Sequence, residues 1–239
     1  MWTLKELFRE ADGMVPTING LFSYELFGQT LWITTTHVTV FIVLVALTAL
    51  SIAAHHKIKK HPDEVPGVFQ NILELIVEKL DGLVAGAMGQ NAHRYRNFIG
   101  TLFAFILVSN LGGIFGLRPA TADFGTTFAL GLTSFFVIQI SAIRAQKWRY
   151  FSSFAKPYFF LAPSNIIGDV STPISLGLRL FANILSGTMI MGLWYGMLGW
   201  ISLFPLSAFL EAYLDIFSAC IQTYVFTMLT MTYINDKIS

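Results

Sequence analysis

Long stretches with few or no charged side chains are the feature that most constrains this sequence. Residues 31–54 contain His37 as their only ionisable group. At a rise of about 1.5 Å per residue, a helix of this length crosses the roughly 30 Å hydrocarbon core of a bilayer. The pattern predicts an all-α membrane protein with five transmembrane helices, the last two long and tilted because they exceed the length of a perpendicular span. The other four spans are predicted at 98–117, 126–143, 165–194 and 205–234.

The composition agrees with a surface that is solvated by lipid. Only 12% of the residues are charged, against roughly 25% in soluble domains, while 54% are hydrophobic and 22 are Phe. The formal net charge of +1 gives no reason to expect a nucleic acid as a partner. Cys220 is the only cysteine, so no intramolecular disulfide can form. These values place the chain outside the range of soluble domains.

A further helix is predicted at 65–88, where apolar and polar residues occupy opposite faces. It carries too many charges to span a bilayer, so we expect it on the cytoplasmic membrane surface or as a hairpin partner. The apolar face contains Val68, Phe69, Ile72, Leu73, Ile76, Val77 and Leu80. The polar face contains Gln70, Asn71, Glu74, Glu78 and Asp81.

Basic residues are distributed unevenly between the two ends of the predicted spans. By the positive-inside rule, segment 1–30 is extracytoplasmic, and the membrane domain 31–239 ends with its C-terminus in the cytoplasm. One base, Arg179, lies within a span, and three are predicted on the extracytoplasmic side: Lys5, Arg9 and Arg118. The eleven cytoplasmic bases are Lys57, Lys59, Lys60, Lys79, Arg94, Arg96, Arg144, Lys147, Arg149, Lys156 and Lys237.

Arg179 is the residue that most needs an explanation, because a guanidinium cannot lose its proton to escape the cost of burial in a membrane. The flanking residues stay mostly apolar for more than two turns on both sides, which is too far for the side chain to snorkel to a headgroup. At helical spacing, Arg179 shares one face with Thr172, Ser175, Asn183 and Ser186. We expect this polar stripe to face protein or water rather than lipid.

Two motifs resemble those of a known family. Residues 175–183 read SLGLRLFAN, which closely resembles the signature SLxLRLFGN of the a subunit of F-type ATP synthases, with Ala182 in place of the commoner Gly. Residues 221–230 read IQTYVFTMLT, which resembles the motif IQAFIFTMLT of the last helix in that family. The likeness extends from the first span to the C-terminus, and two motifs in this order are very specific.

The resemblance implies a bacterial-type stator subunit in the plasma membrane that conducts ions. Arg179 would face the carboxylate of each passing subunit of the c-ring, Asn183 would lie one turn away, and Gln222 would face Arg179 from the last helix. A fixed positive charge lets a rotor carboxylate pass only when it is ionised, and it blocks cation leakage between two aqueous half-channels. Proton or Na⁺ flow would then drive rotation, and the sequence leaves open which ion is used.

Asp169, Glu211 and Asp215 are the only acids in the last two predicted spans. Glu211 and Asp215 share a helical stripe with Ser218 and Gln222. In the family the position of Asp215 is often Glu or His and is assigned to the outer half-channel, so Asp215 is the candidate ion relay. Glu211 is expected nearer the mouth of that half-channel, or else as a solvated residue at the helix start.

Three further polar positions allow more than one interpretation. Asp169 lies four residues before Pro173, which predicts a kink. Family members commonly place an acid in this turn near the cytoplasmic outlet, but Asp169 could equally mark the start of the helix. Asn110 aligns loosely with a polar position of the outer half-channel, and a helix-packing amide is an equal alternative. Thr188 replaces the Glu or His of many relatives, so this outer path has one titratable group fewer.

The implied partners are the c-ring, the b subunits of the peripheral stalk and membrane lipid. The sequence contains no Walker A motif, so nucleotide chemistry is expected on other subunits, and no cofactor or metal site is expected here. A secondary transporter whose buried Arg179 binds an anionic substrate is the main alternative, but it predicts inverted repeats or paired broken helices, and we find neither. A structural subunit without an ion path would leave the two polar stripes unexplained.

Overall fold

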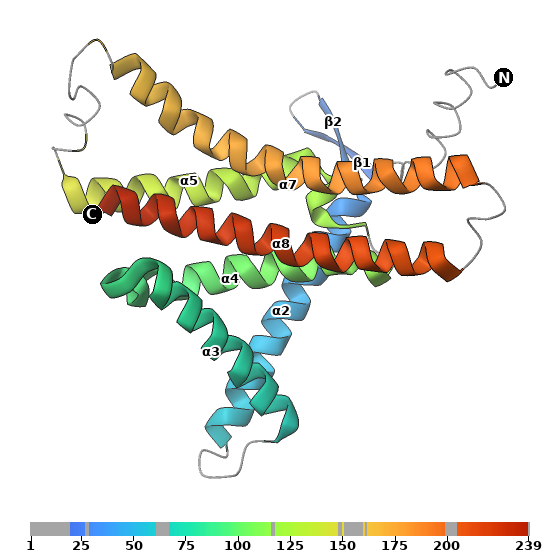
Figure 1. Cartoon of the computed structure of the whole chain (residues 1–239), viewed down its shortest axis with the longest axis horizontal. Coiled ribbons are helices and arrows are strands. Elements are labelled where there is room, and N and C mark those ends of the chain that lie inside the picture. Colours follow the sequence, from blue (N-terminus) through green and yellow to red (C-terminus); the bar gives the residue numbers. More distant parts are fainter. Residues whose placement is uncertain are drawn as a thin grey trace.

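The structure, a computed structural model, describes residues 20–26, 29–60, 67–115, 118–147, 150, 160, 162–198 and 205–238. Within this part of the chain, five helical segments are long and apolar enough to cross a membrane. The predicted all-α membrane class with five spans is therefore confirmed, with one short β-hairpin added (Figure 1). The five segments are 35–56, 68–114, 124–146, 163–197 and 209–238.

The first helix is preceded by the hairpin, which the sequence pattern did not predict. Strand β1 (Gly20–Leu26) pairs antiparallel with β2 (Gln29–Thr34), and helix α2 (Thr35–Lys60) follows directly. The helix therefore begins four residues after the start of the predicted span at Leu31. The β-branched and aromatic residues at the end of β2 favour a strand, although their apolar character extends the hydrophobic run. Of the predicted N-terminal segment 1–30, residues 1–19 and 27–28 lie outside the described residues.

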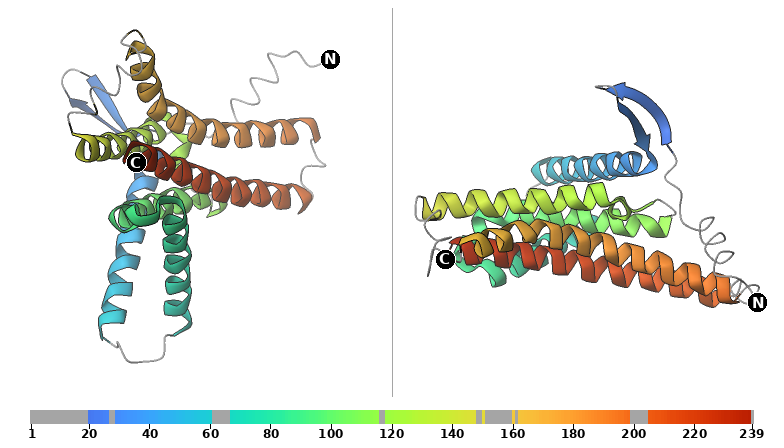
Figure 2. Two further views of the ribbon diagram at one scale, coloured as in Figure 1. Left: turned by 60° about the vertical axis from the view of Figure 1, so that its left-hand side comes forward. Right: turned by 90° about the horizontal axis from the view of Figure 1, so that it is seen from above.

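Helix α3 (Val68–Met88) corresponds to the predicted amphipathic helix 65–88 and continues through the short turn η1 (Gly89–Asn91) into α4 (Ala92–Leu111). The left view of Figure 2 shows α2 and α3 extending away from the other helices. Only the C-terminal part of α3 is buried, where Val84 and Met88 pack in a core shared with α4 and α8. Its N-terminal apolar residues remain exposed on the isolated chain.

Helix α4 leads through the turns η2 (Gly112–Phe115) and η3 (Ala120–Ala122) to α5 (Phe124–Gln146). The carboxylate of Asp123 accepts a hydrogen bond of 3.0 Å from the backbone N–H of Gly125, which caps the start of α5.

The two longest helices are α7 (Ala162–Leu198) and α8 (Pro205–Ile238), and both extend beyond the predicted bounds 165–194 and 205–234. Figure 1 shows them running next to α4 and α5, with α7 visibly bent. Pro173 lies inside α7, as expected for a helix that bends.

Two apolar clusters hold these helices together. One joins α3, α4, α5 and α8 and lies near the end where α5 and α8 finish; the other joins α4, α7 and α8 at mid-length. The first contains Val84, Met88, Tyr95, Ile99, Ile138, Met231 and Ile234. The second contains Leu102, Ile106, Leu176, Leu180 and Phe226. Because Leu176 and Leu180 are both buried, the same stretch of α7 carries Arg179 on a different face, where its side chain is exposed.

Two glycines allow α5 and α7 to cross closely at this level. A Cβ at Gly131 of α5 would lie 2.5 Å from the backbone oxygen of Pro173, and a Cβ at Gly177 of α7 would lie 3.1 Å from the backbone of Phe128. Both approaches are closer than side chains normally permit, so the crossing depends on hydrogen at both positions. The crossing fixes the rotation of α7 only two residues before Arg179.

Candidate functional site

Helices α7 and α8 run antiparallel in a register that two side-chain hydrogen bonds define. The amide of Asn183 donates to the hydroxyl of Ser218, and the indole N–H of Trp194 donates to Ser207 Oγ at 3.0 Å. Trp194 lies eleven residues after Asn183, and Ser207 lies eleven residues before Ser218. The two helices therefore keep the same register over three turns.

This register places Arg179 level with Gln222. Arg179 lies four residues before Asn183 and Gln222 lies four residues after Ser218, so each is one turn from the hydrogen-bonded pair in the same direction. Gln222 is only 5% exposed, and its Nε2 has no hydrogen-bond partner among the described residues. Arg179 is exposed on the isolated chain, and no ion pair joins it to an acid in the described part of the sequence.

Asp215 lies on the side of this pair toward the α7–α8 connection. Its Oδ2 is 3.5 Å from the position that a Cβ at Gly113 would occupy, so the carboxylate packs against the backbone of η2. Glu211 lies one turn further along, is exposed, and its Oε2 accepts a hydrogen bond of 3.1 Å from the hydroxyl of Tyr195. The structure thus has a half-buried acid and an exposed acid one turn apart on α8.

Asn110 lies close to the same region, at the end of α4. Its side-chain oxygen accepts a hydrogen bond from the hydroxyl of Thr121, and the neighbouring Ser109 Oγ accepts one of 3.2 Å from the N–H of Ala120. These contacts fix η3 against α4, which gives Asn110 a packing role. Its Nδ2 is nevertheless buried without a hydrogen-bond partner within the described ranges, so the amide retains a free donor three residues before Gly113.

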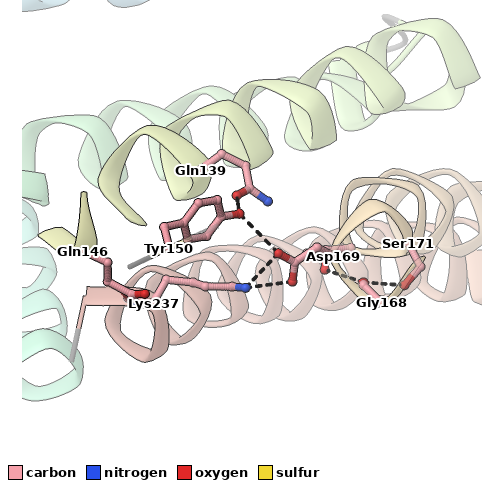
Figure 3. A network of polar contacts seen from close by, with 8 residues as sticks. Gln139, Gln146, Tyr150, Gly168, Asp169, Ser171 and Lys237 are labelled. Atoms are coloured by element: carbon pink, nitrogen blue, oxygen red, sulfur yellow. Dashed lines mark hydrogen bonds and ion pairs between the residues drawn. The ribbon is translucent and has the colours of Figure 1, made fainter. Parts of the chain in front are cut away.

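Asp169 lies at the opposite end of α7, in a network drawn in Figure 3. The ammonium of Lys237 lies 2.8 Å from both Asp169 oxygens. The hydroxyl of Tyr150 lies 3.4 Å from Asp169 Oδ2 and also hydrogen-bonds the side-chain oxygen of Gln139. Gln146 donates to the backbone oxygen of Lys237 at 2.8 Å, so the last turn of α8 is tied to both α5 and α7.

Tyr150 keeps its proton throughout the physiological range. Burial, with a further contribution from the negative charge of Asp169, raises the pKa of Tyr150 to about 12. The phenol therefore acts as a neutral hydrogen-bonding group beside the ion pair.

Several residues of these networks were missed by sequence reasoning. Lys237 was counted only as a cytoplasmic base, although a base in the last turn of a helix is a recognised signal for C-terminal contacts. Tyr150, Tyr195 and Gln139 follow no motif or periodic pattern that could have indicated them.

Thr188 is exposed, and its hydroxyl donates to the backbone oxygen of Leu185 at 2.9 Å.

Five apolar helical spans define an integral, multi-pass membrane protein, and this one has a permanently charged residue between two groups of polar side chains. Comparison with known proteins then identifies the family. The family described as "ATP synthase A chain" matches residues 35–235. The chain therefore belongs to the family of ATP synthase a subunits, and its work lies in ATP synthesis and ion transport at a membrane.

Several relatives resemble this chain over most of its length. ATP synthase subunit a 1 of Syntrophotalea carbinolica is 35% identical over 204 residues, which cover 83% of both chains. ATP synthase subunit a of Moorella thermoacetica is 34% identical over 83% of this chain and 88% of its own length. A subunit a of Propionigenium modestum described as sodium ion specific is 33% identical over 75% of this chain and 66% of its own length.

Proposed function

We propose that this chain is the ion-translocating a subunit of a rotary F-type ATP synthase, in which Arg179 faces the carboxylates of the c-ring and separates two half-channels. One observation carries the proposal: a permanently charged side chain is exposed on a membrane-spanning helix, and no acid of the described chain is paired with it. A charge at this depth needs an anion or water. A membrane-embedded rotor that presents carboxylates supplies the anion.

The outer half-channel is proposed to run past Glu211 and Asp215 to the level of Arg179. Glu211 is exposed near the start of α8, and Asp215 is one turn deeper, packed against Gly113. The buried amides of Asn110 and Gln222, which have no hydrogen-bond partner among the described residues, provide donors beside this route. The polar groups therefore form a graded path from an exposed acid to a buried amide opposite the arginine.

Arg179, Asn183 and Gln222 are proposed to form the barrier between this route and the cytoplasmic half-channel. The fixed charge of Arg179 repels a cation that attempts to cross directly, but it attracts an ionised rotor carboxylate. An ion is thus carried around the barrier on the rotor. Each charge that crosses releases roughly 2.3 kcal/mol per 100 mV of membrane potential, which loading on one side and unloading on the other convert into rotation.

The orientation in the membrane is also part of the proposal. Arg94 and Arg96 near the start of α4, Arg144 at the end of α5, and Lys237 at the end of α8 lie at the same end of the helices. Arg118 lies at the other end, between α4 and α5. The positive-inside rule then puts the C-terminus in the cytoplasm and the start of α2 outside a bacterial plasma membrane. The c-ring and the b subunits of the peripheral stalk are the proposed partners, and nucleotide chemistry lies on other subunits.

The coupling ion is a separate question, because one relative is described as sodium ion specific. ATP-driven uptake by vesicles reconstituted with the whole enzyme identifies the ion when Na⁺ is varied at fixed pH with a protonophore present. Uptake of Na⁺ that survives the protonophore identifies sodium as the coupling ion. Acidification that the protonophore abolishes, at every Na⁺ concentration, identifies the proton.

The test of the proposed function is ATP-driven uptake of that ion by membranes that contain Arg179→Ala. We expect uptake to be lost although the subunit assembles, because no barrier remains between the half-channels. Arg144→Ala is the matched control, since Arg144 is an exposed arginine at the end of α5 and takes no part in the proposed path. Uptake at the wild-type rate in Arg179→Ala contradicts the proposal.

A further inference from the structure

We propose that the ion pair between Asp169 and Lys237 is a latch that fixes the cytoplasmic ends of α7 and α8 together and holds Arg179 level with Gln222. Asp169 is then a positioning residue rather than an acid that carries the ion. This inference rests on the proposed function, because it assumes that Arg179 must lie level with Gln222. It assigns a role to the contacts near the start of α7, which neither the outer half-channel nor the arginine uses.

The contacts at the latch engage three helices. Lys237 Nζ lies 2.8 Å from both oxygens of Asp169, so α8 is tied to α7 by a two-pronged ion pair. The same Nζ lies 5.8 Å from the centre of the Tyr150 ring, and Gln146 of α5 holds the backbone of Lys237. The side chains of Asp169 and Lys237 are 20% and 30% exposed, so water screens the pair only in part.

The geometry does not favour Asp169 as an ion carrier. Both of its oxygens lie 2.8 Å from the ammonium of Lys237, so a cation that approaches the carboxylate is repelled by this positive charge. Its other neighbour, Tyr150, hydrogen-bonds both Gln139 and Asp169, so it belongs to the same network of contacts between helices. Asp169 lies ten residues from Arg179, which corresponds to about 15 Å along a helix and is too far for direct contact.

The latch completes the set of contacts that hold the two long helices in register. On one side of Arg179 the hydrogen bonds from Asn183 to Ser218 and from Trp194 to Ser207 tie α7 to α8. On the other side the tie is the ion pair. Pro173 lies between Asp169 and Arg179 and removes a backbone hydrogen bond from α7, which makes this segment easier to bend. A contact beyond the proline therefore matters for the position of Arg179.

A double-mutant cycle tests the latch in the assembled enzyme. Lys237→Met leaves the carboxylate of Asp169 without its partner. We expect this variant to lower ATP-driven uptake by roughly fivefold, the size of effect that is usual when one of two interacting residues is removed. Asp169→Asn leaves an unpaired ammonium and should act similarly. The double variant leaves neither charge unpaired, and Asn keeps an oxygen for Tyr150, so uptake should return close to wild type. Lys237→Arg keeps the pair and should stay close to wild type.

A second readout reports position directly. Cysteines replacing Asn183 and Ser218, in a Cys220→Ser background, should form a disulfide readily, more slowly with Lys237→Met, and readily again in the double variant. The latch is wrong if Lys237→Met leaves uptake and cross-linking unchanged. It is also wrong if Asp169→Asn and the double variant both assemble without uptake, since Asp169 would then carry the ion. Arg179→Ala in the same assay distinguishes these results from failure of the proposed function, because only that failure leaves Arg179→Ala active.

Discussion

Asp215 and Glu211 differ in the surroundings of their carboxylates, although they lie one turn apart on one helix. Asp215 is half-buried against the backbone of η2, whereas Glu211 is exposed and accepts a hydrogen bond from Tyr195. A charge near the membrane interior is costly, so its presence there indicates a function, whereas an exposed acid at a helix start is tolerated without one. The deeper acid is therefore the better candidate for the relay.

Replacing these two acids separately tests their order. Asp215→Asn keeps the size and shape of the side chain but removes its titratable group, so we expect assembly to survive and ion flux to be lost. Glu211→Gln should slow flux less, and Asp215→Glu should retain part of it. The measurement is ATP-driven ion uptake normalised to subunit content. Wild-type uptake in Asp215→Asn together with loss in Glu211→Gln would reverse the assignment.

Sequence alone indicated some of the residues of the site but not others. Arg179, Asn183 and Gln222 are predicted from the sequence, because a charge in an apolar run is costly and because the surrounding motifs are specific. The partners of Asp169 were not, since Lys237 is 68 residues away and Tyr150 follows the end of another helix. Such contacts depend on how α5, α7 and α8 converge, and no local pattern in the sequence encodes that convergence.

The crossing of α5 and α7 is a close contact between backbones two residues from the arginine. Gly131 and Gly177 bring the two backbones within a distance that excludes a methyl group at Gly131. Small residues at such crossings are the usual means by which membrane helices pack closely. The sequence showed these glycines, but it did not show which of its many glycines lie at a crossing.

Gly131→Ala should therefore impair the enzyme although it lies on a different helix from the site. Its Cβ would be 2.5 Å from the backbone oxygen of Pro173, so the helices must separate, at a cost of about 1–3 kcal/mol. We expect a lower melting temperature of the solubilised enzyme and reduced uptake. Gly187→Ala is the matched control, because no atom of the described chain lies within 4 Å of a Cβ there. Equal behaviour of the two variants would show that the crossing is unimportant.

Element boundaries show where apolar patterns are informative and where they are not. Long apolar runs predict the spans, because only a helix or a closed barrel satisfies the hydrogen bonds of its own backbone in lipid. The start of the first helix was misplaced because Leu31, Trp32 and Ile33 suit a strand as well as a membrane helix. The ends of α7 and α8 lie beyond the predicted bounds. In α8 the additional residues include Asn235, Asp236 and Lys237, which continue the helix beyond the apolar run.

At the scale of the whole molecule, the proposed orientation depends on the basic residues that the helices bring to one end. The two ends of α5 allow a matched test, because Ala145 and Gly125 are both exposed and lie near its opposite ends. In a Cys220→Ser background, Ala145→Cys should react with an impermeant maleimide only from the cytoplasmic side, and Gly125→Cys only from outside. The reverse pattern would invert the topology.

Arg179 is the proposed barrier between the two half-channels, and coupling of ion flow to rotation depends on it. The most direct measurement is ATP synthesis driven by an imposed ion gradient in vesicles that contain the complete enzyme, with passive ion leakage recorded in the same vesicles. Arg179→Ala is predicted to abolish synthesis while leakage through the subunit rises, because ions can then pass between the half-channels without turning the rotor. Synthesis at the wild-type rate with unchanged leakage would contradict the account.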